Sequence, residues 1–438
     1  MIDLASVVFV VLLHLSYLGL GLFWSDAQKR NDVEKLSPIE SIFKHWAIGV
    51  FFAIIILYLA SFLHLYWLGF GAITLLGLLR VLRQLKNLYF EKKISLPSIK
   101  YLFPFSVILI ASVFVFLLNG NLSFHHQVHG VSGMGNWALK SKIIFLESGL
   151  QASYFEHATH YGKFSYPPGL PLINAPLFLI HGSDHDAILK LNSTLIFTSL
   201  FIFLSSLFTL HWKWYSLPAI ILLLGFFLGD AAWSVSYWFY SEPLLIMCCA
   251  ISTLLFLHGD TRSALLAAAG ASMIKQEGVL FLILIGIVCL LFSKERKQVM
   301  FYFALSILPY VSWRLICSFH GINDSDFDFA IANFQPEHIT HAYNSVVKCA
   351  FSKWDSYSGA FALIPVVMVY GCITRNWKML SVLSIPILLI VCYLAAISFS
   401  TIEDIDWHLS ATTRYLMLPA VIILVSLSVL PKVIYEVA

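Results

Sequence analysis

The stretch MLSVLSIPILLIVCYLAAISF, residues 379–399, decides the fold class of this chain. It holds 21 residues, and none of them is Asp, Glu, Lys, Arg or His. A helix rises about 1.5 Å per residue, so about 20 apolar residues cross the roughly 30 Å hydrocarbon core of a bilayer. Uncharged segments of this length are typical of transmembrane helices, and 379–399 is therefore predicted to be one.

Twelve further runs are predominantly apolar, and the chain is 59% hydrophobic but only 12% charged. Soluble domains carry about 25% charged residues. The runs do not alternate as barrel strands do, so helices are the elements that satisfy the backbone in lipid. We predict an all-α polytopic membrane protein with about thirteen transmembrane helices. The predicted spans are 2–24, 42–61, 63–80, 101–118, 187–210, 215–231, 243–258, 262–275, 278–292, 299–318, 360–374, 379–399 and 414–431.

A further apolar stretch, 170–180, is too short to cross a bilayer and is expected to be a re-entrant or interfacial helix. It closes a long loop in which Trp137 to Phe145 form an amphipathic segment. The predicted organisation has three parts. These are N-terminal transmembrane helices in 1–118, an outer loop with amphipathic helices in 119–186, and the remaining transmembrane helices in 187–438, with outer loops near 232–242, 319–359 and 400–413.

Basic residues set the predicted orientation, because Lys and Arg accumulate in short cytoplasmic loops. They gather near 29–35, 83–100, 294–297 and 375–378. With thirteen crossings, and with 170–180 not crossing, all of these loops fall on one side. The N-terminus is then outside. The net charge of +3 provides no basic face, so nucleic acid is excluded as a partner, and membrane lipids are the surroundings.

Charged residues at the outer ends of the predicted spans are candidate functional groups, because ionised side chains at membrane depth are costly. Glu242 lies in YSEPL (240–244), Lys275 and Glu277 lie in KQEG (275–278), and Arg414 opens the last run. A shared cavity that faces outward would explain all four. Simpler interpretations exist for each: a carboxylate favoured by a helix dipole, a hairpin ion pair, and an arginine that reaches the headgroups.

Metal ligation is left open by the sequence. The groups HHQVH (125–129) and HATH (157–160) have the composition of a zinc site but not the spacing of a strong motif, and surface histidines are the simpler interpretation. The segment NDSDFD (323–328) lacks the glycine and the distant glutamate of a calcium loop. A divalent metal is thus the one cofactor left open. Phosphate-binding loops and dinucleotide fingerprints do not occur, which argues against a nucleotide-driven pump.

Five motifs in order resemble the GT-C membrane glycosyltransferases, and bacterial members in particular. They are WALKSK (137–142), YPPGLP (166–171), YSEPL (240–244), IKQEG (274–278) and WHLSATTR (407–414). The resemblance covers about 120–420. That family includes protein mannosyltransferases and lipid A aminoarabinose transferases. The resemblance implies a polyprenyl-phosphate sugar donor, a lipid or glycan acceptor of the cell envelope, and an active site on the periplasmic face of a bacterial inner membrane.

The sequence departs from this pattern at Ser132, where the family usually has an aspartate shortly before its WALK motif. Another group must then take the acceptor proton. Glu242, which stands where the family has a second aspartate, is the leading candidate, and His129 is the next. Glu147 and Glu156 follow, since they share the first outer loop.

The other roles follow from the chemistry of glycosyl transfer, which needs cations on the leaving phosphate and a carboxylate at the acceptor. Lys275 and Arg414 are expected to bind the donor phosphate, and Glu277 is a further catalytic candidate. The aromatic members of the substrate group also suit an interfacial belt. The candidate substrate-binding residues are Trp137, Lys140, His160, Tyr166, Tyr240, Trp407 and His408.

Two other functions fit a chain with many spans and intramembrane charges. A transporter or flippase for a lipid or solute is one, although the sequence has no inverted repeat and its outer loops are long and unequal. A GT-C relative that has lost activity is the other, because Ser132 replaces the expected aspartate.

Overall fold

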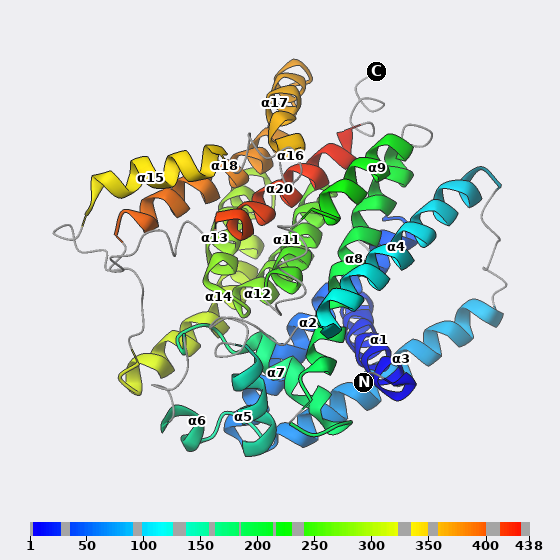
Figure 1. Ribbon diagram of the computed structural model, residues 1–438, viewed down its shortest axis with the longest axis vertical. Helices are drawn as coiled ribbons and strands as arrows, with labels where there is room; N and C mark the ends of the chain where they lie inside the picture. The colour runs from blue at the N-terminus through cyan, green and yellow to red at the C-terminus, as the bar shows by residue number, and fades with distance from the viewer. Residues whose placement is uncertain are drawn as a thin grey trace.

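The chain folds as a bundle of helices, seen in a computed structural model (Figure 1). Helices make up 86% of the described residues and no strand occurs among them, which confirms the all-α prediction. The structure describes residues 3–27, 36–90, 99–125, 137–156, 163–183, 185–212, 216–229, 241–322, 334–348, 358–399 and 412–430.

Seven helices of the described residues are long and apolar enough to cross a membrane. Each overlaps one of the predicted runs. They are α1 (Leu4–Ala27), α2 (Pro38–Phe62), α3 (Tyr66–Phe90), α4 (Ile99–His125), α8 (Ala187–Trp212), α14 (Arg296–Phe319) and α18 (Trp377–Ile397).

The six other runs form shorter helices. One of them, α12, has 12 residues and is about 18 Å long, which is well below the thickness of a bilayer core. Seven spans are therefore shown by length and composition in the described part of the chain, and the count of thirteen is not confirmed. The shorter helices are α9 (Ser216–Phe227), α11 (Glu242–Leu257), α12 (Thr261–Ser272), α13 (Gln276–Phe292), α17 (Ile364–Ile373), preceded by α16 (Ser358–Ala362), and α20 (Thr412–Ser428).

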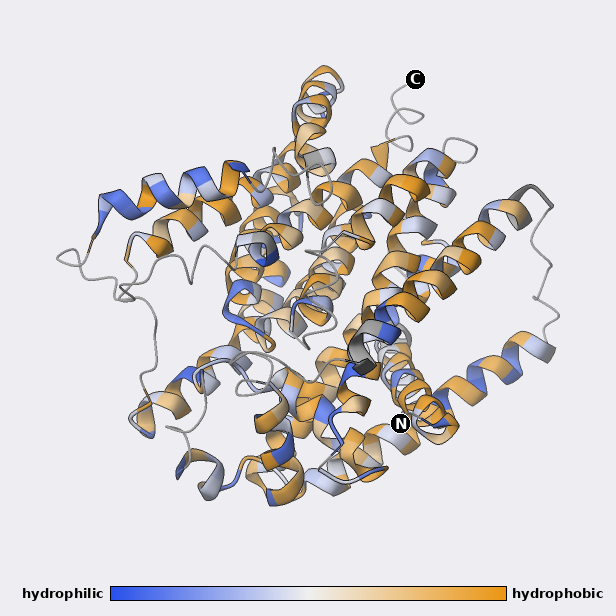
Figure 2. Cartoon of the chain, viewed as in Figure 1, coloured by the Kyte–Doolittle hydropathy of each residue, from blue (hydrophilic) through white to orange (hydrophobic). Residues whose placement is uncertain are grey.

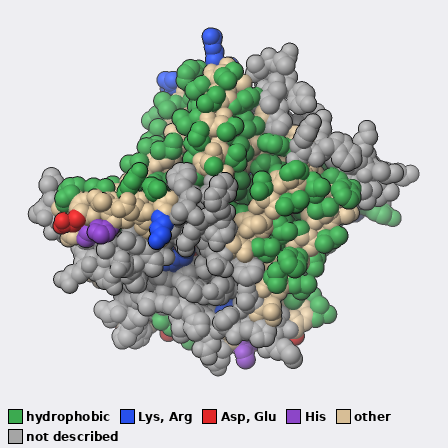
Figure 3. Space-filling model, turned by 45° about the horizontal axis from the view of Figure 1, so that its top comes forward, with side chains coloured by type: hydrophobic (Ala, Val, Ile, Leu, Met, Phe, Trp, Pro, Cys, Tyr) green, Lys and Arg blue, Asp and Glu red, His purple; other side chains and the backbone are tan. Residues whose placement is uncertain are grey.

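Apolar side chains cover the outside of the bundle as well as its inside. In α8, 78% of the apolar window is buried, whereas in α14 only 17% is, so α8 is central and α14 peripheral. Leu308 and Leu315 on α14, and Leu75 and Leu79 on α3, are all more than half exposed. Figures 2 and 3 show hydrophobic residues along most helices and over much of the described surface. Exposed apolar area of this extent needs lipid as its solvent, so the chain is a helical membrane protein.

Glycines let α1 approach its neighbours until the backbones touch. A β-carbon at Gly49 of α2 would lie 1.6 Å from the carbonyl oxygen of Tyr17, and one at Gly21 of α1 would lie 1.7 Å from that of His45. On the other side, a β-carbon at Gly77 of α3 would lie 2.2 Å from the carbonyl oxygen of Ser16. Small residues at helix contacts are how membrane helices gain van der Waals packing without a hydrophobic driving force.

The predicted short helix near 170–180 is present as α7 (Gly169–Asn174) continued by the 3-10 turn η3 (Ala175–Leu179). The Tyr66 hydroxyl of α3 donates to the carbonyl oxygen of Leu172 at 2.7 Å, and Phe178 is fully buried. Its eleven residues span roughly 20 Å, so this segment does not reach across a bilayer. The segment packs against α2 and α5.

The predicted amphipathic segment is helix α5 (Leu139–Glu147), followed by α6 (Ala152–Glu156). Lys142 of α5 pairs with Asp186, just before α8, at 2.9 Å. The Gln151 side chain donates to the carbonyl oxygen of Ser61 at 3.0 Å, which ties the segment to the end of α2. Further along the chain, α15 (Pro336–Val347) packs along α18 (Figure 1).

We expect Gly49→Ala to lower the thermal stability of the protein in detergent, because its new methyl group would meet the backbone of α1. Overpacking of this kind typically costs about 1–3 kcal/mol. Gly71→Ala in α3 is the matched control, since a β-carbon there has open space around it. Melting temperatures of the two variants, followed by intrinsic fluorescence, check this; equal values for both would contradict the packing described here.

Candidate functional site

Four charged residues from three distant segments meet at one end of the bundle. Glu242 begins α11, Lys275 and Glu277 lie at the turn from α12 into α13, and Arg414 lies in the first turn of α20. The Lys275 ammonium lies 3.0 Å from Oε1 of Glu242 and 3.0 Å from Oε1 of Glu277. The Arg414 guanidinium lies 3.9 Å from the same oxygen of Glu242. We name these four residues the charged cluster.

Local sequence explains why the turn that carries Lys275 is so tight. A β-carbon at Gly278 would lie 2.1 Å from the carbonyl oxygen of Ala271, so only glycine lets the first turn of α13 lie against the end of α12. Lys275 itself is extended and precedes the helix. At the start of α11, Pro243 occupies the first turn, where its missing N–H costs nothing. Both carboxylates of the cluster therefore lie in the first turn of a helix, where the dipole favours negative charge.

The charged cluster is internally balanced, with two cations and two carboxylates. Glu242 and Lys275 are nearly buried, with side-chain exposures of 5% and 7%, whereas Glu277 is 27% exposed and Arg414 18%. Buried charges are stable only when they are paired, and removing one partner typically costs about 3–5 kcal/mol. The cluster thus has a sheltered half, Glu242 with Lys275, and a more open half, Glu277 with Arg414.

Aromatic side chains border the charged cluster. The Lys275 ammonium lies 5.1 Å from the ring centroid of Tyr415, and Tyr415 in turn lies 4.5 Å from the ring of Tyr393. Tyr166 stacks on Trp137 with ring centroids 5.7 Å apart and planes at 17°. Burial raises the pKa of the Tyr166 phenol to about 12, and all four members of the charged cluster act on it electrostatically. Tyr166 is therefore a neutral hydrogen-bonding group beside these charges.

A backbone contact joins the segment YPPGLP to the charged cluster. The amide of Gly169 donates to the carbonyl oxygen of Met273 at 2.8 Å, two residues before Lys275. A β-carbon at Gly169 would lie 2.4 Å from that same oxygen. The motif YPPGLP is thus in direct contact with the residue that precedes the motif IKQEG.

Lys140 of the motif WALKSK is fully buried and contacts backbone carbonyl groups. Its ammonium donates to the carbonyl oxygen of Lys163 and lies 3.4 Å from that of Phe164. It also lies 5.9 Å from the ring of Trp137. Lys140 thereby holds the backbone that leads to Tyr166.

The structure brings together Glu242, Lys275, Glu277 and Arg414, with Tyr166 and Trp137 beside them. Glu147 and Glu156 are exposed, at the last residues of α5 and α6. Other predicted positions lie outside the described residues: His129, Ser132, His160, Tyr240, Trp407 and His408, with most of the histidine groups and the segment 323–328.

Sequence reasoning missed Tyr415 and Tyr393, the aromatic pair next to Lys275. Tyr415 follows Arg414 directly and was hidden in the apolar run of the last helix. Tyr393 lies inside the uncharged stretch 379–399, where one tyrosine is unremarkable by pattern alone. The adjacency of Tyr415 to a charged residue at a helix start was the available signal.

Comparison of the chain with protein-family models, with curated proteins and with solved structures found no match. The resemblance to GT-C glycosyltransferases therefore stays a prediction from the five motifs.

We expect Lys275→Met to destabilise the protein strongly, by about 3–5 kcal/mol, because it leaves two carboxylates without their shared cation. Adding Glu242→Gln should recover part of this loss, since one of the two stranded charges is then removed. The measurement is the melting temperature of each single variant and of the double variant.

The matched control is Arg262→Met, which breaks the more exposed pair that Arg262 forms with Glu295 at 3.0 Å. Surface pairs contribute about 0–1 kcal/mol, so its melting temperature should change little. Additive effects of Lys275→Met and Glu242→Gln would show that the two side chains do not interact as described.

Proposed function

We propose that this chain is a glycosyltransferase of the GT-C type, which transfers a sugar from a polyprenyl-phosphate carrier to a lipid or glycan acceptor of the cell envelope. The observation that supports this most is the charged cluster itself. Two cations and two carboxylates converge from three segments, and the motif YPPGLP contacts the turn that carries one of the cations. Such a set can bind a phosphate and accept a proton in one place.

Arg414 and Lys275 are the groups proposed to bind the donor phosphate. As the bond between sugar and phosphate breaks, negative charge accumulates on the phosphate oxygens, and fixed cations stabilise that charge. Arg414 is the more accessible of the two, and its planar guanidinium suits a phosphate that it can bind with two hydrogen bonds. A lipid-borne phosphate lies at the membrane interface, where Arg414 in the first turn of α20 would meet it.

Glu277 is the carboxylate best placed to act as the base. It is the more exposed of the two acids, and Lys275 contacts it at 3.0 Å. Glu242, by contrast, has two cations near one oxygen, which favours a role in positioning Lys275 and Arg414. With Ser132 in place of an aspartate, His129 remains the further candidate from the first outer loop.

The proposed orientation places the charged cluster on the periplasmic face of a bacterial inner membrane, in a thirteen-span topology. Glu242 begins α11 and Lys275 follows α12, yet the two side chains touch, so the pair α11–α12 returns to the side from which it started. This supports the alternation on which the thirteen-span count depends. The shorter helices would cross where neighbouring helices bury their ends.

Transfer activity tests the proposal. We expect Arg414→Ala to reduce the transfer of sugar from a polyprenyl-phosphate donor about 100- to 1000-fold, as the loss of one group that stabilises transition-state charge does elsewhere. Arg262→Ala, at the other end of α12, is the matched control and should keep its activity. Radiolabelled donor and purified protein in vesicles provide the measurement, with donor binding followed separately.

The same assay distinguishes the candidate bases and the alternative functions. Glu277→Gln should lose transfer and keep donor binding, whereas His129→Ala should keep most of the transfer. If the unmodified protein and all variants bind the donor but transfer no sugar, the result would favour an inactive relative. Movement of lipid or solute across the vesicle membrane without transfer would favour a transporter.

The proposed orientation predicts which cysteines an impermeant thiol reagent reaches. Glu147→Cys and Lys294→Cys both place the thiol at exposed positions. In intact cells stripped of their outer membrane, Glu147→Cys should be labelled from outside and Lys294→Cys only after lysis. The reverse result would invert the topology and place the charged cluster on the cytoplasmic side.

A further inference from the structure

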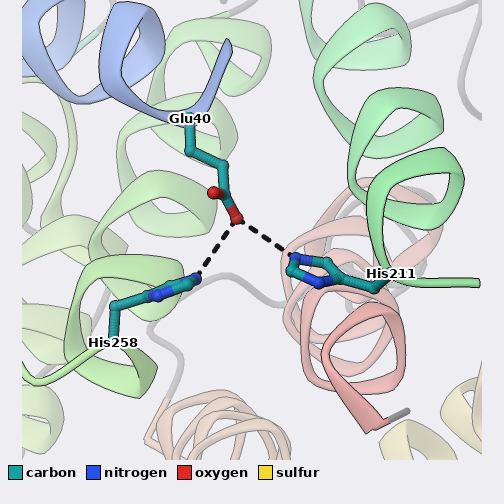
Figure 4. A group of neighbouring side chains, drawn as sticks. All are labelled: Glu40, His211 and His258. Carbon is teal, nitrogen blue, oxygen red and sulfur yellow. Dashed lines mark hydrogen bonds and ion pairs between the residues drawn. The ribbon is translucent and has the colours of Figure 1, made fainter. Parts of the chain in front are cut away.

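A second group of ionisable side chains lies inside the bundle, away from the charged cluster. It consists of Glu40 in the first turn of α2, His211 near the end of α8, and His258 just after α11 (Figure 4). Glu40 and His258 are buried, with side-chain exposures of 2% and 3%, and His211 is 12% exposed. Because α11 has 16 residues and is about 24 Å long, His258 lies far from Glu242 at its other end. This group is therefore separate from the proposed transfer site.

The three side chains converge on one point. Oε1 of Glu40 lies 3.2 Å from Nε2 of His211 and 3.2 Å from Nε2 of His258. One ligand atom from each residue lies within 4.8 Å of the other two. In a tetrahedral zinc site with bonds of about 2.0–2.1 Å, neighbouring ligand atoms are about 3.3 Å apart. Both carboxylate-to-imidazole distances match this edge length.

The carboxylate is oriented by a second interaction, as metal ligands commonly are. The sequence Ser37–Glu40 forms a capping box at the start of α2. The amide of Ser37 donates to Oε2 of Glu40 at 2.7 Å, and the amide of Glu40 donates to the Ser37 hydroxyl at 3.3 Å. One oxygen of Glu40 is thus occupied by the cap, and the other is directed at the two histidines.

The neighbouring charges do not compete for this group. Lys44, one turn further along α2, pairs with Asp260 at 2.5 Å, so its charge is balanced outside the group. On the far side, the indole of Trp212 donates to the carbonyl oxygens of Leu427 and Ser428, which holds the end of α20 beside His211. These contacts hold α2, the end of α8 and the segment after α11 around the point where the three donor atoms meet.

We propose that Glu40, His211 and His258 bind one divalent transition-metal ion, for which zinc is the best match, at the end of the bundle opposite the charged cluster. Two imidazoles and a carboxylate are a common zinc ligand set, and imidazole also suits copper, nickel and iron. Water or an anion would complete the coordination, since no further His, Cys, Asp or Glu of the described residues joins the group. The ion would join α2, α8 and α11, which are distant in sequence.

Metal content tests this proposal without reference to activity. Untagged protein, purified in detergent, is stripped with a chelator, reloaded with zinc chloride and freed of excess metal before elemental analysis. We expect one zinc ion per chain and a higher melting temperature than in the stripped protein. Glu40→Gln, His211→Gln and His258→Gln should each weaken zinc binding at least tenfold, measured by competition with a fluorescent chelator.

The matched control is His45→Gln, which removes a buried histidine of α2 that lies outside the group. It should keep the zinc and its affinity. If all three ligand variants keep zinc with unchanged affinity, other residues bind it, and the proposal is overturned. The absence of zinc binding by the unmodified protein would overturn it as well.

Cobalt provides a readout that needs no variant and so does not depend on variants that fold. Co²⁺ loaded into the stripped, unmodified protein should show the intense visible absorption of a four-coordinate ion, and zinc should displace it. A weak spectrum like that of hydrated Co²⁺ would contradict a tetrahedral site at Glu40, His211 and His258.

Discussion

The ion pair between Lys275 and Glu242 is the interaction on which the arrangement of the second half of the bundle depends. Its 3.0 Å contact joins the start of α11 to the turn between α12 and α13, and Arg414 adds the start of α20 to the same carboxylate. In a lipid solvent neither charge could remain alone, because the desolvation of an unpaired ion costs several kcal/mol. Once these contacts form, the starts of α11, α13 and α20 and the end of α12 have one common position.

The helices themselves are held by a different force. Between α1, α2 and α3, backbone packs against backbone at glycines. Lipid tails are as apolar as leucine, so the hydrophobic effect does not drive the association of helices in a membrane. Two groups of ionisable side chains lie at opposite ends of the bundle: the charged cluster at one, and Glu40 with His211 and His258 at the other. Close packing in the middle and paired charges at the ends are complementary solutions to the same solvent.

Much of this could be predicted from the pattern of apolar residues. All thirteen runs form helices, because a backbone in lipid must satisfy its own hydrogen bonds. Pattern could not assign their lengths: α3 continues to Phe90, past Arg80 and Arg83, because leucines recur along one side and long basic side chains can reach outward from an apolar helix. The residues of the charged cluster were predictable too, since a charge at the edge of an apolar run stands out.

By itself, the sequence determined that this is a helical membrane protein and which charges are costly enough to need partners. A pattern in the sequence predicts relations between neighbouring residues and the positions of helix ends. Only the tertiary structure decided which residues pair with these charges. Glu40 and His211 are 171 residues apart in sequence, and the shared oxygen that also faces His258 exists only because α2, α8 and α11 pack at one end of the bundle. Such convergence is a property of packing in three dimensions, which hydropathy along a chain does not contain.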